Sequence, residues 1–132
     1  EMEQLLVRLG KKPVKITFAP HLVPLDRGIY ATIYAPLKKK LSTKQLRAVY
    51  AKYYGTEPFI RLLPEKSSPD LKSLAGTNLC ELGMTMDQKG KRAIVISAID
   101  NLGKGAAGQA VQNMNLVYGF PETAGLIWPG RS

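Results

Sequence analysis

The sequence has little of the residues from which many catalytic and structural sites are built. It contains one cysteine, Cys80, and one histidine, His21, among 132 residues. A single cysteine excludes a disulfide within the chain and a cysteine-rich metal site. No apolar run approaches the roughly 20 residues that a membrane-spanning helix needs. We therefore expect no metal site, no internal disulfide and no membrane span in these residues.

Acidic residues are also scarce, so the net charge is +9 and the isoelectric point is about 9.8. A basic surface can serve nucleic acid, anionic lipid or an anionic small substrate. Much of the excess lies in short runs at 11–12, 38–40 and 89–92, each at a predicted turn or element end, which is typical of solvated ends. Because no nucleic-acid-binding motif accompanies these runs, we expect no nucleic-acid partner, and a basic nucleic-acid-binding module remains the alternative.

The spacing of apolar residues predicts one domain over residues 1–132, of a size that buries a core. We predict helices over 2–10, from the Ser42–Gln45 capping box to Gly55, and over about 103–118. We predict strands over 14–18, 29–35 and 59–63, a hairpin of 80–86 with 92–99, and irregular loops over 19–28 and 64–69. The fold class is α+β, with helices on one face of a largely antiparallel mixed sheet.

Two features invite a catalytic interpretation that their context does not favour. Cys80 opens an alternating strand with its side chain on the inner face, which favours a structural thiol over a reactive one. Residues 103–108 match G-x-G-x-x-G, but no second parallel strand and no acidic residue about 20 positions later follow them. We interpret these small residues as a surface that lets the helix approach another backbone closely.

Three stretches carry a specific resemblance: residues 18–29 (FAPHLVPLDRGI), 76–80 (GTNLC) and 97–115 (SAIDNLGKGAAGQAVQNMN). They resemble the C-terminal half of N-acetyl-gamma-glutamyl-phosphate reductases, and the last is shared more loosely with aspartate-semialdehyde dehydrogenases. The resemblance runs from Glu1 to about Leu126. It implies a substrate-binding and dimerisation domain related to that of glyceraldehyde-phosphate dehydrogenase, in a dimeric or tetrameric enzyme of arginine biosynthesis.

The resemblance implies reduction of an acyl phosphate to a semialdehyde with NADPH, through a cysteine thiolate that displaces phosphate. In such families that cysteine precedes the region matched here, so we expect this chain to lack the nucleophile and most of the NADP site. Because the chain starts at Glu1 rather than Met, we expect it to be part of a longer protein. We predict that it is inactive alone and that the last helix packs against a Rossmann domain outside it.

Four residues take site roles from the resemblance. His21 matches the catalytic acid/base, Arg27 suits a phosphate or carboxylate of the substrate, and Asn101 with Gly105 matches the cofactor side. Simpler interpretations stay open: a hydrogen-bonded loop histidine, a surface arginine after a turn, and an asparagine that caps the last helix.

Other functions also stay open. The same chemistry can act on carrier-linked aminoadipyl phosphate in lysine biosynthesis. An assembly domain is also possible, because tyrosines on the predicted strands and helix can build an oligomer interface. We expect a bacterial, cytoplasmic protein, with an organellar location left open because the chain does not begin with Met.

Overall fold

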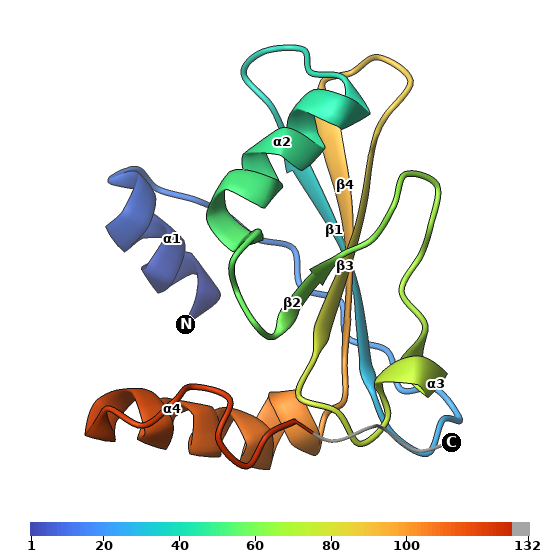
Figure 1. Ribbon diagram of the computed structural model, residues 1–132. Coiled ribbons are helices and arrows are strands. Elements are labelled where there is room, and N and C mark those ends of the chain that lie inside the picture. The colour runs from blue at the N-terminus through green and yellow to red at the C-terminus, as the bar shows by residue number, and fades with distance from the viewer. Residues whose placement is uncertain (128–132) are drawn as a thin grey trace.

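The computed structural model describes residues 1–127. In chain order these residues form α1 (Met2–Gly10), β1 (Ile29–Pro36), α2 (Thr43–Tyr54), β2 (Ile60–Leu62), α3 (Leu71–Leu74), β3 (Cys80–Met86), β4 (Arg92–Ile99), the π-helical turn η1 (Gly103–Ala107) and α4 (Gly108–Tyr118). Figure 1 shows α1, α2 and α4 on one side of the sheet and the short α3 on the other. Within residues 1–127 no helix has the length and apolarity to span a membrane.

The sheet has four strands in the order β1-β4-β3-β2. β4 pairs antiparallel with both β1 and β3, whereas the three-residue β2 runs parallel to β3. The β3–β4 hairpin forms where the sequence predicts it, because the Asp87 carboxylate accepts the backbone N–H groups of Lys91 and Arg92 at 2.8 and 3.1 Å. Gly90 closes this turn at a φ of +65°, which glycine adopts without steric cost. The predicted α+β class and largely antiparallel sheet are confirmed.

Helix α2 begins at the predicted capping box. The Ser42 hydroxyl accepts the Gln45 backbone N–H at 3.2 Å, and the Gln45 side chain accepts the Ser42 backbone N–H at 2.8 Å. The helix buries Leu46 against the sheet, where it contacts β2 and β3, and Figure 1 shows it on the same side of the sheet as α1. The core beneath it contains Leu46, Leu82, Met84, Ala93 and Val95, with cysteine and further aliphatic residues packed around them.

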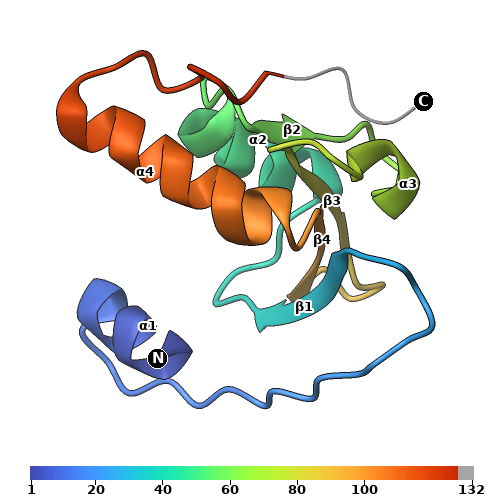
Figure 2. The same cartoon turned by 90° about the horizontal axis from the view of Figure 1, so that it is seen from below.

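The predicted strand over Val14, Ile16 and Phe18 is wrong. The structure gives residues 13–23 no helix or strand, and Phe18 is exposed. Alternation alone does not make a strand, because a strand also needs a neighbour for its backbone groups. Figure 2 shows this segment running along the periphery, outside the four paired strands. α1 forms as predicted but buries none of its residues.

A short helix, α3, was not predicted. The Asp70 side chain caps it by accepting the Lys72 backbone N–H at 3.1 Å, and Leu74 is fully buried. The loop before it crosses the sheet face opposite α2, where the buried Glu81 carboxylate binds Arg61 at 2.9 Å and the Asp70 N–H at 3.3 Å. A four-residue helix is too short for a periodic apolar pattern, so its sequence signal is the capping aspartate alone.

The predicted last helix is confirmed, but its first turn is wider than an α-helix. Figures 1 and 2 show it starting at the end of the sheet and running away on the α1 side. It buries Gly108, Gln112 and Asn115, whereas Met114 and Tyr118 are exposed. Of the predicted apolar stripe, only Val111 is partly buried, so α4 turns its polar side toward the rest of the chain.

Candidate functional site

A buried aspartate at the end of β4 organises the candidate site. The Asp100 side chain is fully covered, and one of its oxygens accepts backbone N–H groups from Leu102 at 2.9 Å and Gly103 at 3.3 Å. The other oxygen accepts the backbone N–H of Gly76 in the turn before β3. These bonds join the start of η1 to a turn that lies 24 residues earlier in the chain.

Arg27 binds the same carboxylate from the end of the long loop. Its Nε donates to Asp100 Oδ1 at 3.1 Å, and its Nη2 donates to Oδ2 in an ion pair. Burial by itself raises the pKa of Asp100, but the bonds from Arg27, Gly76 and the η1 start outweigh it and leave that pKa lowered. The Arg27 side chain remains 24% exposed, and its bonds to Asp100 use Nε and Nη2 rather than Nη1.

Asn101 binds Gly28, the residue that follows Arg27 in the long loop. Its Oδ1 accepts the Gly28 backbone N–H at 2.7 Å, and Gly28 has a φ of +124° that disfavours other residues there. The structure therefore brings together three of the four predicted site residues: Arg27, Asn101 and Gly105, whose N–H donates to the Asp100 carbonyl at 2.8 Å. Asn101 is partly exposed, and the donor side of its amide can face a ligand.

His21 lies outside this cluster in an exposed part of the loop. Its Nδ1 lies 3.0 Å from the Ala19 carbonyl oxygen. Because a carbonyl only accepts, this contact places a hydrogen on Nδ1, and in a neutral imidazole the lone pair is then on Nε2. This contact is compatible with both interpretations of His21, a hydrogen-bonded loop histidine and a proton acceptor.

The glycines of the G-x-G-x-x-G look-alike serve close packing. A Cβ on Gly103 would lie 2.5 Å from the Thr77 carbonyl oxygen, and one on Gly108 would lie 2.2 Å from Asn78 Oδ1. The predicted close approach to another backbone is confirmed at Gly103, whereas at Gly108 the closest neighbour is a side chain. Gly105 is exposed, and a Cβ there would meet only ordinary to tight contacts with Asp100 and Ile99, at 3.3 and 3.4 Å.

A polar network behind these glycines was not found from the sequence. Gln112 Oε1 accepts the Asn78 amide at 3.1 Å and the Lys104 ammonium at 2.6 Å, and the Gln112 amide donates to Glu122 at 2.6 Å. Lys104 also lies 5.4 Å from the Phe59 ring centroid. Burial lowers the pKa of Lys104, although nearby acidic groups act in the opposite direction. No local sequence pattern predicts this network, because its members are spread along the chain from Phe59 to Glu122.

Cys80 fits the structural interpretation. It is partly buried at the start of β3, it packs against the α2-side core, and its Sγ lies 3.6 Å from Ser97 Oγ. Within residues 1–127 no three His, Cys, Asp or Glu side chains gather where they would hold a metal ion.

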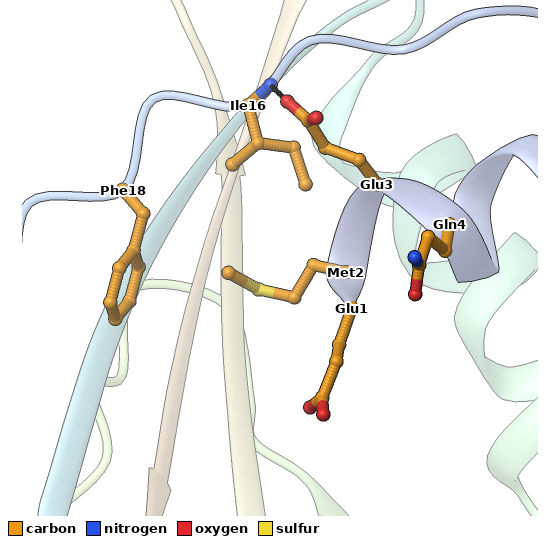
Figure 3. Close-up of a pocket in the computed structure, with 6 residues that line it drawn as sticks. All are labelled: Glu1, Met2, Glu3, Gln4, Ile16 and Phe18. Carbon is orange, nitrogen blue, oxygen red and sulfur yellow. Dashed lines mark hydrogen bonds between the residues drawn. The ribbon is translucent and has the colours of Figure 1, made fainter.

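Two surface hollows lie away from the cluster. One, of about 320 Å³, is lined by Glu1, Met2, Glu3, Gln4, Ile16 and Phe18, and the other lies at the β3–β4 turn. Figure 3 shows Met2, Ile16 and Phe18 facing the first hollow, which the bond from the Ile16 N–H to the Glu3 carboxylate closes on one side. Neither hollow is lined by one of the four predicted site residues.

Comparison with known proteins gives consistent results. The family model of the semialdehyde dehydrogenase dimerisation domain matches residues 1–101. The chain is 55% identical over 126 residues to the N-acetyl-gamma-glutamyl-phosphate reductase of Geobacter metallireducens, covering 96% of the chain and 36% of that protein. It is 51% identical over 130 residues to the reductase of the same name from Pelotomaculum thermopropionicum, covering 98% of the chain and 38% of the relative.

Among solved structures, the fold is similar to that of aspartate semialdehyde dehydrogenase II from Vibrio cholerae, crystallised as a complex with ASA. The TM-score is 0.60 at 20% identity, over 73% of this chain and 28% of that one. At this identity the likeness concerns the fold alone. The resemblance drawn from the three motifs is confirmed, and the chain spans little more than a third of the length of the curated relatives it matches.

Proposed function

The chain belongs to the semialdehyde dehydrogenase dimerisation-domain family, and from that premise we propose that it is the substrate-binding and dimerisation part of an N-acetyl-gamma-glutamyl-phosphate reductase. Such an enzyme converts N-acetylglutamyl 5-phosphate and NADPH to N-acetylglutamate 5-semialdehyde, NADP and phosphate, in arginine biosynthesis. The observation that carries the proposal is identity above 50% over nearly the whole chain with reductases of that name. These relatives favour the acetylglutamyl substrate over a carrier-linked aminoadipyl one.

In this proposal the reacting thiolate belongs to the part of the enzyme that this chain does not span. It attacks the acyl carbon, the C–O bond to phosphate breaks, and inorganic phosphate leaves. His21 takes the thiol proton on Nε2 and later gives a proton to the oxygen that becomes the aldehyde oxygen. The exposed imidazole supports this role because its Nδ1 is engaged by the Ala19 carbonyl, which leaves Nε2 as the nitrogen for proton transfer.

Arg27 binds an anionic group of the substrate in this proposal. Its Nε and Nη2 are engaged by Asp100, so the anion is bound through the remaining N–H groups around Nη1. The pair with Asp100 reduces the net positive charge that the anion meets. Arg27 therefore contributes direction more than charge, since the remaining donors of its planar guanidinium point along one edge.

When bound, the reduced cofactor NADPH would supply the hydride that reduces the thioester carbon, after which the C–S bond breaks and releases the aldehyde and the thiolate. The residues of this chain fit one edge of such a cofactor: Gly105 is exposed with no side chain, and the Asn101 amide has a donor side for a carboxamide oxygen. Most of the cofactor site lies outside this chain in the proposal. Residues 103–108 are then a packing surface beside the cofactor, not a phosphate-binding loop.

The apolar side of α4 supports a contact with the rest of the proposed enzyme. Met114 is 46% exposed and Val117 is 79% exposed on a helix whose other side is buried. We assign this side to the Rossmann domain that the additional length of the relatives would supply. Val117→Asp in the complete enzyme should weaken that contact and raise KM for NADPH, whereas Lys44→Asp on the exposed start of α2 is the control. Unchanged KM and thermal stability in Val117→Asp would contradict the assignment.

Homo-oligomer formation follows from the family's dimerisation role, and we place the enzyme in the bacterial cytoplasm.

The decisive experiment is the replacement of His21 by Asn in the complete reductase. The rate of NADPH oxidation with N-acetylglutamyl phosphate should fall by about 100- to 10,000-fold. Thermal stability should not change, because His21 is exposed. If His21→Asn retains the wild-type turnover, its role is structural.

An aminoadipyl substrate is tested in the same assay by comparing kcat/KM for the two acyl phosphates. The nucleic-acid alternative predicts binding that weakens steeply with salt. Absence of binding to a mixed-sequence DNA duplex and to single-stranded RNA at low salt eliminates it.

A further inference from the structure

Asp100 contacts more residues of the candidate site than any residue to which a role was assigned above. Its carboxylate binds Arg27 from the loop, Gly76 from the turn before β3, and both residues that open η1. Its own carbonyl accepts the Gly105 N–H at 2.8 Å. One buried residue thus contacts the candidate substrate residue, and through its backbone it also holds a candidate cofactor residue.

We propose that Asp100 is a positioning residue, which fixes the guanidinium of Arg27 and the amide of Asn101 relative to each other. This inference rests on the proposed function, since it concerns the same site. It assigns no contact between Asp100 and the substrate, because the carboxylate is covered by its partners.

The need for such a residue comes from the loop that carries Arg27. Residues 11–28 contain no helix or strand, and most of their side chains are exposed. Ordering a long arginine side chain costs about 1.5–2 kcal/mol in rotamer freedom, so an arginine at the end of such a loop has no fixed direction by itself. Two donors of Arg27 on two oxygens of Asp100 fix both the position and the plane of the guanidinium.

The other part of the proposed positioning arrangement is the turn that contains Asn101. Asp100 bonds the backbone of Leu102 and Gly103 through its side chain and that of Gly105 through its carbonyl, so Asn101 lies inside a closed turn. Asn101 in turn accepts the Gly28 N–H, next to Arg27. Loss of the carboxylate frees the Arg27 guanidinium and the N–H groups of Leu102 and Gly103, because the bond that remains between the loop and the turn, from Gly28 to Asn101, holds only the loop backbone.

The test is a kinetic comparison of Asp100→Asn and wild type in the complete reductase, with kcat and both KM values measured separately. We expect KM for the acyl phosphate and KM for NADPH each to rise at least about tenfold, since small displacements of positioning groups have effects of this size. A purely structural role lowers the amount of folded enzyme, which lowers apparent kcat and leaves both KM values unchanged. Asp87→Asn is the matched control: this aspartate also accepts backbone N–H groups in a turn, but at the opposite end of β4.

A second variant keeps the inference testable if Asp100→Asn does not fold. Arg27→Lys retains the charge but loses the two-pronged bond. It should raise KM for NADPH as well as for the acyl phosphate, whereas a residue that only binds substrate affects the acyl phosphate alone. In the double variant Arg27→Ala/Asp100→Asn, KM for the acyl phosphate should match that of Arg27→Ala alone, because the two residues act as one unit.

The outcomes separate the two claims. If the wild-type enzyme does not reduce the acyl phosphate, the proposed function is wrong. If the wild-type enzyme is active and both KM values stay within twofold of wild type in Asp100→Asn and Arg27→Lys, only the positioning role is overturned.

Discussion

Gly108→Ala tests whether the glycines at 103–108 serve packing or phosphate binding. A Cβ at position 108 would lie 2.2 Å from Asn78 Oδ1 and 2.8 Å from the Gly103 carbonyl oxygen. An ordinary contact needs about 3.5 Å, so Asn78 or the helix must move by about 1 Å. Asn78 is 1% exposed and its amide nitrogen donates to Gln112, so a movement of this side chain breaks that bond.

The cost follows from these contacts. Overpacking a closed interior costs about 1–3 kcal/mol. Loss of the Asn78–Gln112 hydrogen bond adds about 1 kcal/mol. The expected loss is therefore about 2–4 kcal/mol, a large part of the 5–15 kcal/mol that a typical domain has.

The assay is urea-induced unfolding of the chain, followed by far-UV circular dichroism. Gly10→Ala is the control, because a Cβ at Gly10 has no neighbour within 4 Å and the substitution should not destabilise the chain. In the complete reductase, the packing interpretation predicts that Gly108→Ala lowers the free energy of unfolding before it affects NADPH binding. If Gly108→Ala leaves the free energy of unfolding unchanged but weakens NADPH binding, the glycine serves the cofactor and the packing argument is refuted.

Three further predictions concern the cap, the buried carboxylate and the isolated chain. Ser42→Ala should cost about 1 kcal/mol in urea unfolding, because the Gln45 backbone N–H loses the serine hydroxyl as its acceptor while the bond from the residue-42 N–H to the Gln45 side chain remains. No loss would show that the hydroxyl does not cap the helix in solution. The folded-state pKa of Asp100 is lowered, so its stabilising contribution is complete above the unfolded pKa of about 3.9 and is lost as pH falls through the folded pKa. The difference in unfolding free energy between wild type and Asp100→Asn should therefore shrink below about pH 4, and a constant difference would mean that charge is not its cause. The 132 residues alone should show no NADPH-dependent reduction of the acyl phosphate, and measurable turnover would contradict the proposal that the nucleophile lies elsewhere.

The elements predicted correctly are those whose causes are local. The capping box needs residues three positions apart, and the hairpin needs alternation on both sides of one turn. Val14 to Phe18 failed because alternation describes the two faces of a strand but not the strand beside it. That partner is a property of the whole fold, and none of the four described strands pairs with this segment.

The candidate site divides in the same way. Its residues were found through motifs, but the bond that joins Arg27 to Asp100 connects positions 73 apart and has no local signature. The sequence nevertheless contains one indication of the role of Asp100. An aspartate at the end of a strand and directly before a helix start can cap that start, which is what its bonds to Leu102 and Gly103 do.

The orientation of the last helix also has a physical explanation outside its own sequence. Gln112 and Asn115 face inward because the returning segment offers Glu122 and the carbonyls of Glu122 and Ala124 at 2.6–3.1 Å. Leu126 then closes this side at 2% exposure. Buried amides of this kind are stable only when bonded, so the tail determines which side of α4 faces the sheet. The apolar residues of the second half of α4 are thereby turned outward: Met114, Leu116, Val117 and Tyr118. Because contiguous exposed apolar surface of this kind marks an interaction site, the same bonds that fold the tail also prepare α4 for the domain that we propose beside it.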